Sequence, residues 1–431
     1  MIHLNWLLIG FLAIFVLRSL TQGVLHGLNI SFLRREGDKV PDVFQDVVDR
    51  EKLKTISAYT IDAAKIGMVD TLVSQAMLLV ILLSGFLPWL EKMIRQWGLG
   101  VITGGLCFFA LLSIITQLLR LPFSLYDTFV VEKRYGFNTM TFKLWIVDLA
   151  KSITLSALLG GLVLGFLLAL VVYGGSLWWV WAWIVLGLFE LLLIWLFPLV
   201  IAPLFNKFEP IENKDLEHQI DTLMGHVGLR VQGVFRMDAS KRSKHTNAYF
   251  TGLGRSKRIV LFDTLLKSHA EDEILAVLAH EIGHWKKKHM LKGLLLVEIL
   301  SLVGLYAVAA FLDWPTLYET FGFQGPIPYV GLFLLGTCVG LIGYFVQPLE
   351  SAISRRFERE ADDFSLKLMK VAEPMRRALK RLATDNLSNV SPHPVYAWFY
   401  YSHPPLAERI MRLKDRPSDS VVDPSGCSTT L

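Results

Sequence analysis

The chain has 431 residues, of which 53% are hydrophobic and 19% charged, and its mean hydropathy is +0.45. This composition excludes a disordered or fibrous protein and argues against a water-soluble enzyme, whose surface needs more charge. The net charge of +5 comes from basic loops between apolar stretches, and no nucleic-acid module or cysteine framework is recognisable. The sequence therefore predicts a polytopic α-helical membrane protein.

Seven apolar stretches reach the length of about 20 residues that a helix needs to cross a bilayer. The first contains Arg18 and lacks a small-residue cleavage site, so we interpret it as a retained helix. Asp70, Glu190 and Glu298 lie within spans, where charged groups usually face protein or water. The predicted spans are residues 3–25, 66–88, 98–119, 152–173, 177–201, 291–312 and 328–349.

Lysine and arginine are concentrated in alternate loops, which orients the spans because cytoplasmic loops carry more positive charge. This pattern predicts an external N-terminus, a cytoplasmic C-terminus and two cytoplasmic segments that together form one mixed α/β domain. We expect a loose polar tail at the end of the chain. The predicted divisions are membrane spans one to five (1–201), the first part of the cytoplasmic domain (202–290), a membrane hairpin (291–349), the second part of that domain (350–416) and the tail (417–431).

Two elements are expected in the first cytoplasmic part. Residues 258–266, RIVLFDTLL, contain β-branched and aromatic residues typical of a strand. Residues 271–288 begin with Glu-Asp-Glu and then repeat apolar residues at helical spacing. They predict a helix whose acidic first turn complements the helix dipole.

The predicted helix contains the motif HEIGH, with His280, Glu281 and His284. Residues four apart lie on one helix face, so both imidazoles can bind one metal ion. Glu281 lies beside them and can accept a proton from the attacking water. Chance matches to HExxH occur, so the motif alone leaves open a solvated helix whose histidines have no function.

A zinc site of this kind needs a third protein ligand. The pattern HExxHxxGxxH is rejected because Lys287 and Met290 occupy its last two positions, and we interpret His289 as a solvated surface residue. A later predicted helix, residues 354–369, places Glu358 and Asp362 on one face, whereas Glu360 points about 200° away. Glu358 can ligate the metal while Asp362 orients a ligand histidine.

Several motifs, in order, resemble the CAAX prenyl protease 1 family of integral-membrane zinc endopeptidases, over nearly the whole chain. The resemblance implies seven spans that enclose a water-filled chamber, with a gluzincin-type catalytic domain on the cytoplasmic side. The matching segments are PFSLYDTFVVEKRYGFN (122–138), IAPLFNKFEPI (201–211), NAYFTGLG (247–254), AHEIGHW (279–285), SRRFEREAD (354–362) and YSHPPLAERI (401–410).

The resemblance also implies roles for individual residues. It makes His280, His284 and Glu358 the ligands of one zinc ion, Glu281 the general base, and Asp362 a proton donor, although the helical spacing favours an orienting role for Asp362. His403 would stabilise the oxyanion with support from Arg409. The predicted substrate-binding edge strand contains Asn247, Ala248 and Tyr249.

The sequence thus predicts an endopeptidase that uses zinc-activated water to cleave peptides near a C-terminal prenylated cysteine. Residence in the bilayer brings the enzyme close to lipidated substrates. A quality-control metalloprotease of the heat-shock type and a channel or transporter with a fortuitous motif remain as alternatives. A membrane-embedded site-2-type protease is disfavoured because WKKKH follows the motif directly. The C-terminal segment lacks an obvious retrieval signal, which favours a bacterial inner membrane over the endoplasmic reticulum.

Overall fold

The membrane half of the protein is a set of long apolar helices. The computed structural model describes residues 2–37, 39–229, 231–252 and 257–414. Within these ranges, six helical segments are long and apolar enough to span a membrane, or seven if a bent helix pair counts as one span. The fold of a polytopic helical membrane protein is therefore confirmed. The main helices are α1 (Trp6–Glu36), α2 (Arg50–Leu83), α4 (Val101–Tyr126), α6 (Phe142–Tyr173), α7 (Trp178–Leu196) and α12 (His289–Phe311).

Helices α1 and α2 begin at side-chain caps, and each extends at one end beyond the apolar stretch that predicts it. Leu8 N donates to Asn5 Oδ1 at 3.0 Å in α1, and Lys52 N donates to Asp49 Oδ1 at 2.7 Å in α2. Such caps satisfy backbone donors that the first helical turn leaves free. Helix α2 starts sixteen residues before its predicted span, which begins at residue 66, so its first part belongs to the soluble side.

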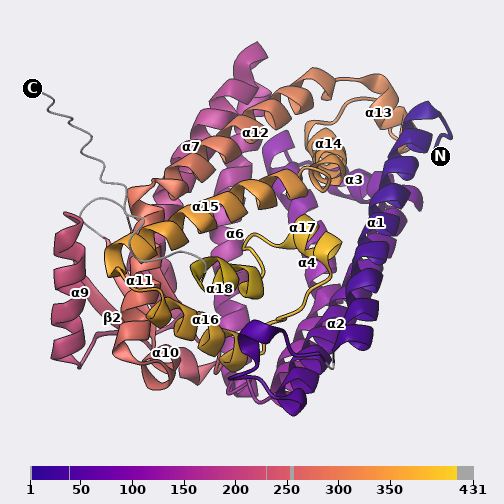
Figure 1. Ribbon diagram of the computed structural model, residues 1–431. Helices are drawn as coiled ribbons and strands as arrows, with labels where there is room; N and C mark the ends of the chain where they lie inside the picture. The colour runs from indigo at the N-terminus through magenta and orange to yellow at the C-terminus, as the bar shows by residue number, and fades with distance from the viewer. Residues whose placement is uncertain (1, 38, 230, 253–256, 415–431) are drawn as a thin grey trace, which may run out of the picture.

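The seventh predicted span ends at a bend. Helices α14 (Pro328–Gly343) and α15 (Gln347–Met369) meet at 56°. As a result, α15 crosses in front of the ring of spans in Figure 1 and carries Glu358 toward α11 (Glu271–Lys286). Successive spans contact one another, and α14 contacts α1, so the spans form a closed ring.

Short elements lie at one end of the ring and in the connections between the spans and the rest of the chain. At the end bearing the N-terminus, α3 (Phe86–Gln96) and α13 (Pro315–Thr320) contribute side chains to one hydrophobic core, and Asn5 Nδ2 donates to Thr320 Oγ1 at 2.7 Å. Two π-helical segments, η2 and η4, connect spans to the soluble domain; a proline within η4 removes one backbone donor. The connecting elements are η2 (Asp127–Val131), α5 (Glu132–Arg134), η3 (Gly175–Leu177), η4 (Phe197–Ile201) and α8 (Ala202–Phe205).

A four-stranded sheet forms one layer of the catalytic domain, in the order β1-β2-β4-β3. The pairs β1–β2 and β3–β4 are antiparallel, and β2–β4 is parallel, so β3 is an edge strand. The predicted strand 258–266 is shorter than expected, because a helical turn begins at Asp263, whose carboxylate accepts from Ser240 N at 2.9 Å. The strands are β1 (Phe208–Pro210), β2 (Gly233–Met237), β3 (Ala248–Thr251) and β4 (Arg258–Phe262).

Helices cover this sheet and provide the framework of the site. The predicted metal helix is observed as α11, with acidic residues in its first turn as expected. Its buried side chains, including Leu278 and Ile282, form one core with Ile259 and Leu261 of the sheet. The remaining elements are η1 (Asp42–Phe44), α9 (Lys214–His226), η5 (Ala239–Lys241), α10 (Asp263–Ser268), α16 (Glu373–Asp385), α17 (Pro394–Tyr400) and α18 (Leu406–Lys414).

Candidate metal centre

Helices α11 and α15 approach each other closely at the HEIGH motif. A Cβ added to Gly283 would lie 2.9 Å from Ala361 Cα and 3.1 Å from Ala361 O. One turn away, Ser365 Oγ donates to Ala276 O at 3.0 Å. This contact between backbones brings the side chain of Glu358 to the two histidines of α11.

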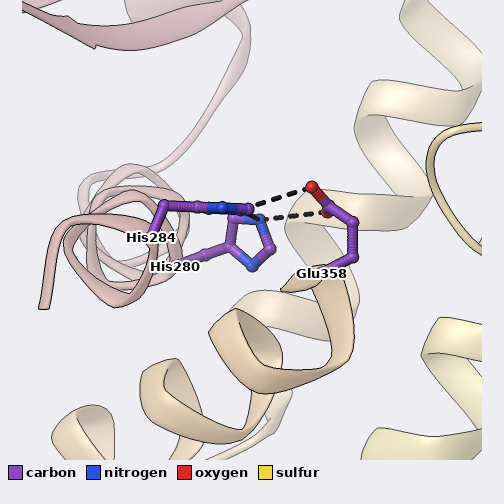
Figure 2. A group of neighbouring side chains, drawn as sticks. All are labelled: His280, His284 and Glu358. Carbon is purple, nitrogen blue, oxygen red and sulfur yellow. Dashed lines mark hydrogen bonds and ion pairs between the residues drawn. The ribbon is translucent and has the colours of Figure 1, made fainter. Parts of the chain in front are cut away.

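Three side chains converge on one point (Figure 2). His280 Nε2 lies 3.3 Å from Glu358 Oε2, His284 Nε2 lies 3.3 Å from Glu358 Oε1, and the two Nε2 atoms are 3.1 Å apart. The candidate ligand atoms of His280, His284 and Glu358 all lie within 4.8 Å of one another. Glu358 Oε2 is buried without a hydrogen-bond partner. Two imidazole nitrogens and one carboxylate oxygen are a donor set that suits a catalytic zinc ion.

Asp362 and Arg409 hold the ring of His280 in place. His280 Nδ1 lies 2.8 Å from Asp362 Oδ1, and Arg409 Nε and one terminal nitrogen donate to the same carboxylate at 3.0 and 2.6 Å. All three side chains are buried. A hydrogen bond from Nδ1 to a carboxylate fixes the tautomer and leaves the Nε2 lone pair free for a metal. The bidentate guanidinium favours the ionised form of Asp362.

His284 is supported through His289, which corrects one sequence interpretation. His289 is 4% exposed rather than solvated, and its Nδ1 lies 3.1 Å from His284 Nδ1. Its Nε2 lies 3.2 Å from Glu360 Oε2, and its ring stacks on Phe357 at 4.4 Å. His289 is the first residue of α12, after the turn that ends α11, and this turn directs its ring toward α15. Glu360 faces His289 and not the three converging ligand atoms.

Glu281 follows His280 on α11 and is half-buried. Burial raises the pKa of Glu281, while the neighbouring imidazoles oppose that shift. A carboxylate next to a metal site is suited to accept a proton during hydrolysis. The structure therefore places a candidate base beside the three ligand atoms.

The segment after α17 brings a further imidazole to this point. His403 Nε2 lies 3.2 Å from Glu358 Oε1, and the His403 side chain is 61% exposed. Arg355 donates to Trp398 O and Tyr401 O at 3.0 and 2.7 Å, which fixes the turn before His403. An exposed N–H held beside the ligand cluster is available to a bound substrate.

The candidate substrate-binding strand lies at the sheet edge. Ala248 and Tyr249 belong to β3, and Asn247 directly precedes it. Strand β3 pairs with β4 on one side, with Ala248 opposite Leu261. Asn247 is exposed, and its carbonyl accepts from Phe262 N at 3.1 Å. An exposed strand edge can pair with an extended peptide.

Sequence reasoning missed two residues that shape the site. Gly283 permits the close approach of α15. In the sequence, this role is indicated only by the small size of the residue between the two motif histidines. His289 supports His284, and its position five residues after His284 gave no helical-face argument, because α11 ends at Lys286.

One helix carries the HExxH histidines and a candidate base, and a later helix supplies a glutamate. Set against membrane spans, this arrangement defines an integral-membrane metallopeptidase. Residues 210–417 match peptidase family M48, and residues 29–207 match the family described as CAAX prenyl protease N-terminal, five membrane helices. The chain belongs to the CAAX prenyl protease 1 family.

Individual relatives span almost the full chain. CAAX prenyl protease 1 homolog of Arabidopsis thaliana is 35% identical over 88% of this chain and 92% of its own length. CAAX prenyl protease 1 of Saccharomyces cerevisiae is 35% identical, over 87% and 88% respectively. The crystal structure of S. mikatae Ste24p matches with a TM-score of 0.89 and 33% identity, covering 95% of this chain and 99% of that one.

These relatives bear on the predicted location. Membrane residence with several spans is confirmed by the helices and the family match. The two curated relatives named above come from a plant and a yeast, so they give no support to a bacterial inner membrane. The predicted tail, with Cys427, lies outside the described residues.

Proposed function

We propose that the protein is a zinc metalloendopeptidase that cleaves peptide bonds near the C-terminus of CAAX-type substrates carrying a prenylated cysteine. The convergence of His280, His284 and Glu358 is the single observation that carries this proposal. Zinc bound there would act as a Lewis acid and activate water for attack on the scissile carbonyl. The buried, unpartnered Glu358 Oε2 supports this fit.

The residues around the ligands would supply proton transfer, orientation of a ligand and stabilisation of the oxyanion. Glu281 takes the proton from the attacking water and passes it toward the leaving amine. We assign Asp362 to orientation of His280 rather than proton donation, because Arg409 stabilises its carboxylate form. His403 donates to the oxyanion that develops at the scissile carbonyl, and Arg409 adds positive charge behind the site.

The edge strand supports a role in holding the substrate. An extended peptide that pairs with β3 at Asn247, Ala248 and Tyr249 presents a backbone carbonyl toward the ligand cluster on α11. The membrane setting favours a peptide with a lipid attached, since such a substrate already partitions into the bilayer. We place the catalytic domain in the cytoplasm on the basis of loop charge.

A peptide library that contains CAAX sequences with and without a farnesylated cysteine tests this proposal. Mass spectrometry of the products should show cleavage after the farnesylated cysteine, and a zinc chelator should abolish it. Equal cleavage of unmodified, unrelated peptides would favour the quality-control alternative. Chelator-insensitive or absent proteolysis by purified protein would contradict the proposal and favour the channel alternative.

A further inference from the structure

One face of helix α1 is polar although the helix is an apolar span. Arg18, Gln22, His26 and Asn29 follow one another at intervals of four, four and three residues. This spacing places them in one row along the helix. Helix α1 lies beside α17 in Figure 1, and His26 contacts the ring of Tyr400 with 5.5 Å between ring centroids. His26 therefore faces the segment that leads to His403, as does Asn29, whose Oδ1 accepts from His393 N at 3.0 Å, whereas Gln22 accepts from Gln75 of α2 at 3.1 Å.

Arg18 is the charged member of this row and has no carboxylate partner among the described residues. Its guanidinium carbon lies 5.3 Å from the ring centre of Tyr344, and its buried Nε has no hydrogen-bond partner. By contrast, Arg120 in α4 reaches Asp70 at 3.3 Å. A charge inside a span is costly unless it is paired, so an unpaired arginine marks a place for an anion.

Two tyrosine hydroxyls link this position to the segment that carries His403. Tyr344 OH and Tyr400 OH are 2.7 Å apart, and Tyr400 precedes His403 by three residues. Three residues span about 10 Å at most when extended. The three residues that follow the cysteine of a CAAX sequence have the same reach. A substrate with its scissile bond beside His403 therefore has the reach to bring its last residue to the segment that holds Tyr400, whose hydroxyl adjoins that of Tyr344 beside Arg18.

We propose that Arg18, with the hydroxyls of Tyr344 and Tyr400, binds the C-terminal carboxylate of the substrate. This inference rests on the proposed function and adds a basis for substrate selectivity. The site would select peptides whose free C-terminus lies three residues after the scissile bond. Guanidinium and carboxylate form strong, charge-assisted hydrogen bonds, and the low dielectric of the surroundings strengthens them. Internal peptide segments lack this carboxylate and bind less well.

The test compares two farnesylated peptides that differ only in a free carboxylate or a carboxamide at the C-terminus. Wild-type protein should cleave the acid with a kcat/KM about 10- to 100-fold higher than the amide, mainly through KM. Arg18→Gln should lose this preference and cleave the amide as wild type does, which also shows that it is folded. Arg18→Lys should keep part of the preference. Arg120→Gln, which removes a paired arginine, should keep all of it.

The outcomes are separable. If wild type cleaves the acid but Arg18→Gln retains the full preference, the carboxylate-binding role is wrong and the proposed function stands. Equal cleavage of both peptides by wild type overturns the inference in the same way. Cleavage of neither peptide by wild type overturns the proposed function and this inference together.

Discussion

Gly283 faces Ala361 so closely that a Cβ on the glycine would lie 2.9 Å from the Cα of Ala361. The contact joins the helix that carries both motif histidines to the helix that carries Glu358. The two nearest atoms in the way belong to the backbone of Ala361 and the third is the Cβ of Phe364, so a larger residue cannot be accommodated by a side-chain rotation. The spacing of the ligands therefore depends on a residue that has no side chain.

Gly283→Ala is expected to separate α11 from α15 and weaken the metal site. Overpacking of this kind costs about 1–3 kcal/mol in stability. Zinc content of the purified variant, measured by elemental analysis, should fall together with the melting temperature. Gly293→Ala is the matched control, because a Cβ at Gly293 of α12 meets nothing within 4 Å. Full zinc occupancy in Gly283→Ala would show that the helix contact does not set the ligand spacing.

Helical spacing in the sequence is enough to predict the position of a side chain where that position depends only on the face of one helix. The i,i+4 relation of His280 and His284, and of Glu358 and Asp362, placed these side chains correctly because an α-helix fixes their directions. His289 was misplaced because the chain turns at Lys288, whose φ of 55° no periodicity argument anticipates. The close approach at Gly283 was equally inaccessible, since it depends on the path of α15 after its bend.

Glu281→Gln should retain zinc and lose hydrolysis. The three candidate ligands stay in place, whereas the amide cannot accept the proton of the attacking water. A general base contributes about 10²–10⁴-fold, so turnover of a farnesylated peptide should drop by that factor. Wild-type turnover in a folded, zinc-loaded variant would remove Glu281 from this role.

Glu358→Ala and Glu360→Ala separate the two acidic residues of α15. Loss of a group that orients a ligand costs about 10–100-fold in metal affinity, and loss of a ligand itself should cost more. Glu360 acts only through His289, so its variant should keep most of its zinc. Zinc titration against a competing chelator measures both affinities. An equal loss in the two variants would contradict the proposed ligand assignment.

His245 predicts a pH-dependent contribution to stability. Burial lowers the pKa of His245, but hydrogen bonds to Glu132 and Asn386, both at 3.2 Å, outweigh it and raise the pKa above its usual value. The unfolded histidine titrates near pH 6.5, so the contribution is complete below about pH 6.5 and disappears as pH rises through the raised pKa. The melting-temperature difference between wild type and His245→Gln in detergent should shrink with increasing pH. A difference that is constant from pH 6 to 9 would show that the pair contributes no charge-dependent stability.

The last prediction concerns topology and does not depend on the chemistry. A reporter that functions only in the cytoplasm should be active after residue 60, within 210–240 or after residue 431, and silent near residues 94, 175 and 320. The reason is the alternation of basic and non-basic loops. The fold also groups the N-terminus with the loops near residues 94 and 320. Asn5 donates a hydrogen bond to Thr320, and Tyr329 OH lies 3.4 Å from Glu91 at that end of the ring.

The position near residue 320 is the decisive one. Helices α12 and α14 must form a hairpin that returns the chain to the side it left, since otherwise Glu358 cannot reach His280 and His284. Activity of a reporter near 320 together with one within 210–240 would place both ends of α12 on the same side. That result would contradict the hairpin, and it would also contradict the proposed metal centre because Glu358 could not then reach the two histidines.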